Sequence, residues 1–156
     1  MTAVLAPLET DTGISVEAEQ LFHDELLRSI ESASIASVDR DHVVREAVGW
    51  AERASTDDWD GEGGRRVEQS TLRYATRFLW SLPREVSAPS VLVDRDGDYV
   101  FDWDSQDSTF SVSIGRDGTL TFAGLFRDGK VHGRELLGSM IPATVLLGIS
   151  RVQSPL

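Results

Sequence analysis

The chain of 156 residues contains no cysteine. This absence excludes a disulfide framework, a thiolate zinc site and a cysteine nucleophile. The sequence also lacks any run approaching the roughly 18 apolar residues that a membrane-spanning helix needs. Its N-terminus has no basic region followed by an apolar run, which is the pattern of a signal peptide. We therefore expect a cytoplasmic protein that does not enter a membrane.

Basic residues are scarce, with 15 Lys and Arg against 26 Asp and Glu, and the net charge is −11. The imbalance lies in residues 1–66, which hold 15 acidic and 6 basic residues. Such an acidic chain repels phosphate backbones, which argues against direct nucleic-acid binding. The same charge attracts a basic protein partner.

The strongest local pattern lies between Ser90 and Leu136. Asp-Gly pairs occur at 96–97, 117–118 and 128–129, and a further break covers residues 105–108. Asp-Gly suits a two-residue hairpin turn. The runs between these breaks are rich in Val, Thr and aromatic residues, as strands are. The connections are too short for helical crossovers, so the pattern predicts a five-stranded antiparallel meander.

Alternation within these runs predicts one buried and one polar face of the sheet. The residues expected on the buried face are Tyr99, Phe101, Trp103, Phe110, Val112, Ile114, Leu120, Phe122 and Phe126. The residues expected on the polar face include Asp102, Asp104, Ser111, Ser113, Thr119 and Thr121, with His132 nearby. This face holds hydroxyls and a base, but no nucleophile motif surrounds its serines. We therefore assign no catalytic residue and regard an enzymatic activity as the less favoured hypothesis.

Helical periodicity appears on both sides of the meander. Apolar positions predict helices over about 16–36 and 41–54, joined by a break at 37–40 into an antiparallel hairpin. A third helix is expected over about 68–82, and a last one begins near Pro142. The predicted fold class is α+β: a five-stranded antiparallel meander covered by helices, with an N-terminal helical hairpin. The expected divisions are a flexible tail 1–15, the hairpin 16–55, the α+β domain 56–152 and a tail 153–156.

The most distinctive segment is the loop before the third helix, which places four carboxylates around a tryptophan. Its candidate binding residues are Asp57, Asp58, Trp59, Asp60 and Glu62. Clustered carboxylates suit Mg²⁺ or Ca²⁺. The calcium-loop pattern is incomplete, however, because the required glycine and the final glutamate are missing. We expect no metal site and no cofactor. The structural alternative is that Trp59 anchors the loop in the core while Asp60 caps a turn through backbone N–H groups.

Five segments between about residues 57 and 152 together resemble a group of small uncharacterised bacterial proteins. They are the loop Trp59-Asp60-Gly61-Glu62-Gly63, the helix end Phe78-Leu79-Trp80-Ser81-Leu82-Pro83, the run Phe110-Ser111-Val112-Ser113-Ile114-Gly115, the strand Ala123-Gly124-Leu125-Phe126 and the segment Val131-His132-Gly133. The chain departs from the group's loop at Glu62, where an aromatic residue is expected, and at Gly64, where alanine is expected. The resemblance implies that the loop, helix and meander form one unit with residues 1–55 attached. It implies no particular activity.

The function that these observations favour is a non-catalytic, acidic protein-binding module, such as an antitoxin, immunity or inhibitor-type protein. Its expected partner is a basic protein, and the N-terminal helices are the expected surface. Two alternatives remain open. One is a metal-dependent hydrolase that uses Asp58, Asp60 and Glu62, and the other is a structural homo-oligomer.

Overall fold

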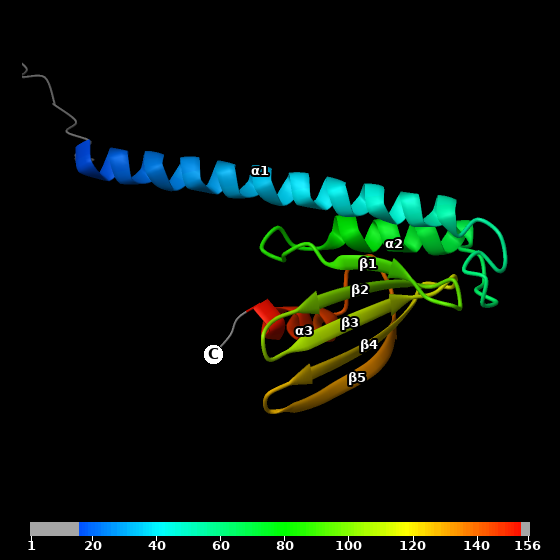
Figure 1. Cartoon of the computed structure of the whole chain (residues 1–156). Helices are drawn as coiled ribbons and strands as arrows, with labels where there is room; N and C mark the ends of the chain where they lie inside the picture. The colour runs from blue at the N-terminus through cyan, green and yellow to red at the C-terminus, as the bar shows by residue number, and fades with distance from the viewer. Residues whose placement is uncertain (1–15, 154–156) are drawn as a thin grey trace, which may run out of the picture. The chain divides into compact units, whose positions relative to one another are not determined.

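The computed structural model describes residues 16–153, apart from the side chains of residues 16–19, 21, 22 and 29–38. The elements in chain order are α1 (Val16–Arg53), α2 (Gln69–Ser81), β1 (Ser90–Val93), β2 (Tyr99–Asp104), β3 (Thr109–Ile114), β4 (Thr119–Phe126), β5 (Gly129–Leu136) and α3 (Ala143–Gln153) (Figure 1). The chain divides into two compact units, residues 1–34 and 35–156. The second unit holds the sheet, and the description below concerns it unless stated otherwise.

The five strands form one antiparallel sheet in the order β1-β2-β3-β4-β5, so the predicted meander is confirmed. Two of the predicted Asp-Gly turns place their glycines at positive φ, 79° at both Gly97 and Gly118. The pairing brings Phe101 opposite Val112, and Val112 opposite Phe122. Apolar side chains from three strands therefore line up in one row across the sheet.

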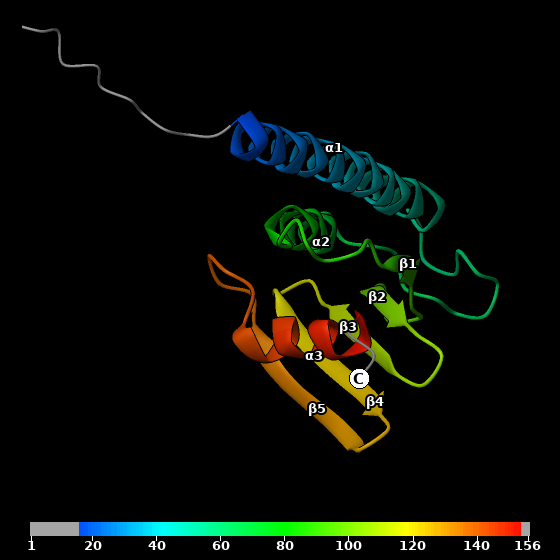
Figure 2. The ribbon, with the colours of Figure 1, turned by 90° about the vertical axis from the view of Figure 1, so that its left-hand side faces the viewer.

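All the residues predicted for the apolar face are buried, with 8% exposure or less. Helices α2 and α3 cover this face (Figure 2). Phe78 of α2 stacks on Phe101 with ring centroids 5.3 Å apart, and the backbone of α3 lies against Phe110. The prediction of two covering helices is therefore confirmed. Each helix packs on this side of the sheet because it has an apolar stripe with helical spacing.

Helix α1 differs from the sequence prediction. Residues 16–53 form one helix, so the predicted break at residues 37–40 is not seen and the helical hairpin is not confirmed. The break was expected from Ser37, Asp39 and Arg40, yet the segment contains neither glycine nor proline. Serine and aspartate each cost a helix only about 0.5 kcal/mol relative to alanine, which is too little to end it.

The C-terminal part of α1 belongs to the core of the second unit. Val43, Ala47 and Ala54 are buried. The Tyr99 hydroxyl donates a hydrogen bond to the Ala47 carbonyl at 2.5 Å, and the Trp50 indole N–H donates one to the Val91 carbonyl at 3.0 Å. The Val91 carbonyl on the edge strand β1 thus has a hydrogen-bond partner from α1, so it is not open to pairing with another strand.

Some expectations concern the ends of the chain. The predicted tail 1–15 and residues 154–156 lie outside the described residues, and Gln153 forms the end of α3. Over residues 16–153, no helix has both the length and the apolar character that a bilayer span requires.

Candidate functional site

The distinctive loop runs from the end of α1 to the start of α2 and closes on itself. The N–H of Val67 donates to the carbonyl of Ala54 at 2.8 Å, which joins the two ends of the loop. Between these ends, the N–H of Asp58 donates to the carbonyl of Gly64 at 2.6 Å. The segment is therefore a compact loop with fixed ends, a type that commonly carries function.

Two of the predicted binding carboxylates hold the loop backbone in place. The Asp57 carboxylate accepts the N–H of Arg66 at 3.1 Å, and the Asp58 carboxylate accepts the N–H of Gly63 at 2.7 Å. Asp58 has a φ of 61°, which aspartate tolerates better than most residues. Each carboxylate thus satisfies a main-chain donor across the loop.

Asp60 caps the turn at the tip of the loop, as the structural alternative predicted. One carboxylate oxygen accepts the N–H of Glu62 at 2.9 Å and the N–H of Gly64 at 2.8 Å. These two backbone hydrogen bonds lower the pKa of the Asp60 carboxyl, because they favour its charged form. The loop backbone itself therefore stabilises the charged form of Asp60.

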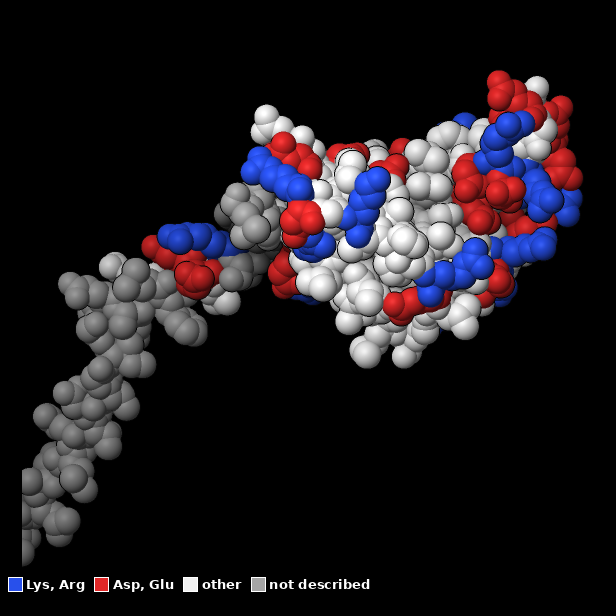
Figure 3. All heavy atoms as spheres, turned by 90° about the horizontal axis from the view of Figure 1, so that it is seen from below, with Lys and Arg blue, Asp and Glu red and all other residues white. Residues whose placement is uncertain are grey.

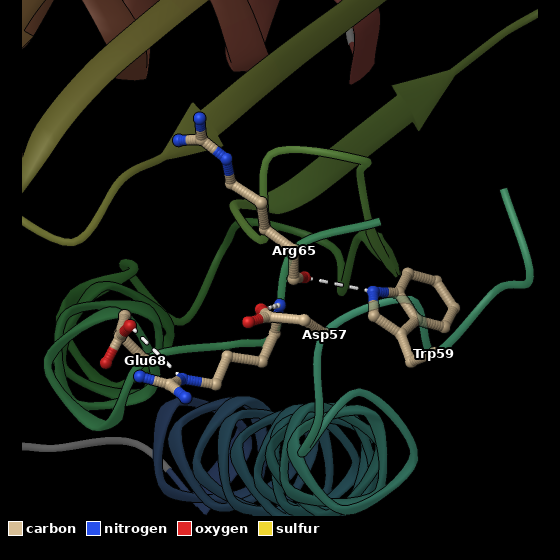
Figure 4. Close-up of polar contacts among 5 residues, drawn as sticks. Asp57, Trp59, Arg65 and Glu68 are labelled. Carbon is tan, nitrogen blue, oxygen red and sulfur yellow. Dashed lines mark hydrogen bonds and ion pairs between the residues drawn. The ribbon is translucent and has the colours of Figure 1, made fainter. Parts of the chain in front are cut away.

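Trp59 fastens the loop to the core, again as predicted. Its indole N–H donates to the Arg65 carbonyl at 3.0 Å, and Figure 4 shows the ring aimed at this point of the main chain. The ring also meets Trp50 edge-on, with centroids 5.9 Å apart, and the Arg53 guanidinium lies over Trp50 at 4.2 Å. Trp59 is half-buried in this position, which makes it a structural anchor.

The loop lies against the turn between β1 and β2. The N–H of Arg65 donates to the Arg95 carbonyl at 2.8 Å. A Cβ on Gly97 would lie only 2.5 Å from the Arg66 carbonyl oxygen. Gly97 is thus required both by its positive φ and by this close approach of two backbones.

A hollow of about 650 Å³ opens where the loop meets the β1–β2 and β3–β4 turns. Figure 3 shows acidic and basic side chains crowded together at this end of the domain. The lining includes Asp57, Asp58, Arg65, Arg66, Glu68, Asp96, Asp98, Arg116 and Asp117. Burial raises the pKa of the Asp98 carboxyl to about 6, and the charges of Asp94, Asp96 and Asp117 add to the effect. The β1–β2 turn is a part of this site that sequence reasoning missed, because nothing in its local pattern reports its contact with a loop 30 residues earlier.

Among the side chains that the structure describes, no group of three or more His, Cys, Asp or Glu is placed to hold a metal ion. Asp57, Asp58 and Asp60 each accept main-chain hydrogen bonds, while the Glu62 carboxylate takes part in none of those described above.

The polar sheet face does not assemble a catalytic triad. Ser111 donates a hydrogen bond to Asp102, its partner across the strands. His132 pairs with Ala123 on β4, and Ala123 in turn pairs with Ser111 on β3. His132 is therefore two strands from Ser111, a separation of about 10 Å, which is too far for proton transfer between them.

Comparison with protein-family models, with curated proteins and with solved structures found no match to this chain. The resemblance to the small bacterial group stays an expectation from the loop and strand motifs.

Proposed function

We propose that this chain is a non-catalytic protein-binding module of the antitoxin, immunity or inhibitor type, and that the N-terminal half of α1 binds a basic protein. One observation carries the proposal. Leu26 and Leu27 of this helix are 52% and 46% exposed, directly after the exposed acidic residues Asp24 and Glu25. Large apolar side chains next to a single sign of charge are suited to a partner that is both apolar and oppositely charged.

The negative charge of the N-terminal half of α1 favours a basic partner over a second copy of this chain. Residues 16–34 contain five acidic residues and one arginine. Two copies of this segment packed along their apolar positions would bring like charges together, which is destabilising. A basic partner would instead be attracted at long range, and the leucines would be buried at contact. The helix is therefore assigned to a partner of a different kind.

The loop at residues 57–62 supports the non-catalytic part of the proposal. Each of its three aspartates accepts backbone N–H groups through one carboxylate oxygen, which accounts for these residues without a catalytic role. On the polar sheet face Ser111 has Asp102 in reach, but His132 lies two strands away, so a Ser-His-Asp arrangement is not assembled.

The test starts with immobilised full-length chain and an extract of its native host, followed by purification of the retained protein. The affinity is then measured directly for the wild type and for Leu26→Asp/Leu27→Asp. We expect the retained protein to have a basic surface and the substitutions to weaken its binding by at least tenfold, which corresponds to about 1.4 kcal/mol. Association should also slow as salt is added, because salt screens the long-range attraction.

Leu147→Asp is the matched control. Leu147 is 63% exposed on α3, so the substitution adds a charge to a surface leucine outside the proposed interface. The control should bind like the wild type. Equal affinity of the wild type and the α1 variant, or a retained partner with an acidic surface, would refute the proposed role of this helix.

A further inference from the structure

One face of the sheet is covered by no helix or strand among the described residues. Helices α2 and α3 both pack on the apolar face, and the opposite face carries the alternate residues of each strand. On this outer face the register aligns Asp104, Thr109, Leu125 and Lys130 in one row. A second row contains Asp102, Ser111, Ala123 and His132. A third row contains Val100, Ser113, Thr121 and Arg134.

The outer face is divided by charge along the strands. Strand β2 contributes Asp102 and Asp104, whereas β5 contributes Lys130, His132 and Arg134. The two strands between them contribute small side chains and one leucine, which are Thr109, Ser111, Ser113, Thr119, Thr121, Ala123 and Leu125. The face thus has an acidic strip on β2, a basic strip on β5, and mostly small side chains on β3 and β4 between them.

A two-fold axis makes such a face complementary to itself. Suppose that the axis lies between the two facing sheets, parallel to the strands and midway between β3 and β4. Then β2 of one copy lies over β5 of the other. Asp104 then faces Lys130 of the partner subunit, and Asp102 faces His132 of the partner subunit. The same contacts recur on the other side of the axis, as an isologous interface requires.

We propose that the outer sheet face mediates a weak face-to-face homodimer in which the β2 strip of each copy pairs with the β5 strip of the other. The occupant is a second copy because Asp104 of each copy meets Lys130 of the partner subunit, while Arg134, in the same row as Val100, has no acidic residue opposite it. Pairing through the β5 edge is disfavoured, because antiparallel β5 strands centred on His132 would place Lys130 opposite Arg134.

The expected strength follows from the area. Four strands about 4.8 Å apart and about 20 Å long present roughly 400 Å² per copy, so the interface is about 800 Å² in total. Stable interfaces bury about 1,200 Å² or more, and smaller ones belong to weak or transient contacts. The dimer should therefore form only at high protein concentration. It uses a different surface from the helix assigned to a basic partner, so either proposal can fail without the other.

The test is sedimentation equilibrium of the full chain from micromolar to millimolar concentration, with two charge-reversed variants. Lys130→Glu/Arg134→Glu makes both strips acidic, and Asp102→Lys/Asp104→Lys makes both strips basic. Each variant alone should lose association by at least tenfold. An equimolar mixture of the two should restore a heterodimer, because each acidic strip then meets a basic one.

Two further variants keep the outcome decisive. Asp104→Lys alone changes an exposed residue, so it serves if loss of the Asp102–Ser111 contact unfolds the double variant. Arg73→Glu/Arg84→Glu changes the net charge by the same amount as Lys130→Glu/Arg134→Glu, but at exposed positions away from this face. This control should associate like the wild type. A wild type that stays monomeric at millimolar concentration, or a mixture that fails to associate, would overturn the proposal.

Discussion

The substitution Gly148→Ala sets two effects of opposite sign against each other. Gly148 lies in the interior of α3. Alanine is favoured over glycine in a helix by about 1 kcal/mol, so helix propensity alone predicts a more stable protein. Packing predicts the reverse, because a Cβ at this position would lie 2.2 Å from one ring carbon of Phe110 and 2.4 Å from another.

The ring of Phe110 has little room to move away. Phe110 is fully buried, and its ring lies 6.0 Å from that of Phe122 and 6.4 Å from that of Phe126. Accommodating the new methyl group would require α3 to shift from the sheet. Overpacking of this kind costs about 3 kcal/mol at the upper end of its usual range. After the propensity gain of about 1 kcal/mol, we expect the free energy of unfolding to fall by about 2 kcal/mol.

Gly49→Ala is the matched control on α1. A Cβ there would lie 3.6 Å from the Arg53 guanidinium, which is an ordinary contact. Only the propensity gain applies, so this variant should be more stable by up to about 1 kcal/mol. Urea unfolding followed by tryptophan fluorescence measures both, and the midpoints should move in opposite directions with unchanged slopes. A Gly148→Ala protein as stable as the wild type would refute the packing of α3 against Phe110.

Three further predictions follow from single side chains. Because the pKa of Asp98 is raised to about 6 in the folded state, stability should fall as pH rises from about 4 to about 6. At pH 7, Asp98→Asn should raise the free energy of unfolding by about 1 kcal/mol, once solvent screening of this partly exposed group is allowed for. Below pH 4 the variant and the wild type should be equally stable, and a difference that is the same at both pH values would contradict the raised pKa. Asp60→Ala removes the acceptor of the Glu62 and Gly64 N–H groups, so amide hydrogen exchange at these two positions should accelerate, and unchanged protection would show that the cap is unimportant. Phe122→Ala should lower the free energy of unfolding by about 3–5 kcal/mol, and a loss below about 1 kcal/mol would contradict its place in the core.

The sheet could be predicted from the sequence because its information is local. Asp-Gly pairs mark the turns, and strict alternation assigns each side chain to a face, since a shift by one residue would reverse every side chain. The ends of α2 agree with the prediction to within one residue, because Pro83 limits the helix from beyond its end. In α3, Pro142 lies just before the first helical residue, and its carbonyl accepts the N–H groups of Val145 and Leu146.

The site could be predicted only in part. The sequence indicated that Trp59 anchors the loop and that Asp60 caps a turn, because both roles depend on near neighbours in the chain. The hollow depends on the contact of Arg65 with Arg95 and on the close approach at Gly97, which are long-range contacts without a local pattern. The helical hairpin stays unconfirmed for a related reason: the break was expected from weak helix formers at residues 37–40, although their combined cost to a helix is small.

The acidic residues of this chain have different roles according to whether main-chain donors surround them. Asp57, Asp58 and Asp60 lie in a loop whose N–H groups point inward, so their charge is used to hold the loop together. The acidic residues of α1 lie on a helix, where interior N–H groups are already bonded to carbonyls four residues earlier. The acidic side chains described on this helix, which include Asp24, Glu25 and Glu46, are exposed, so their charge is directed at the solvent. The carboxylate cluster that is most conspicuous in the sequence therefore stabilises the loop, and its role in binding stays a prediction. The more dispersed acidic residues of the helix are the candidates that we propose for attracting a basic partner.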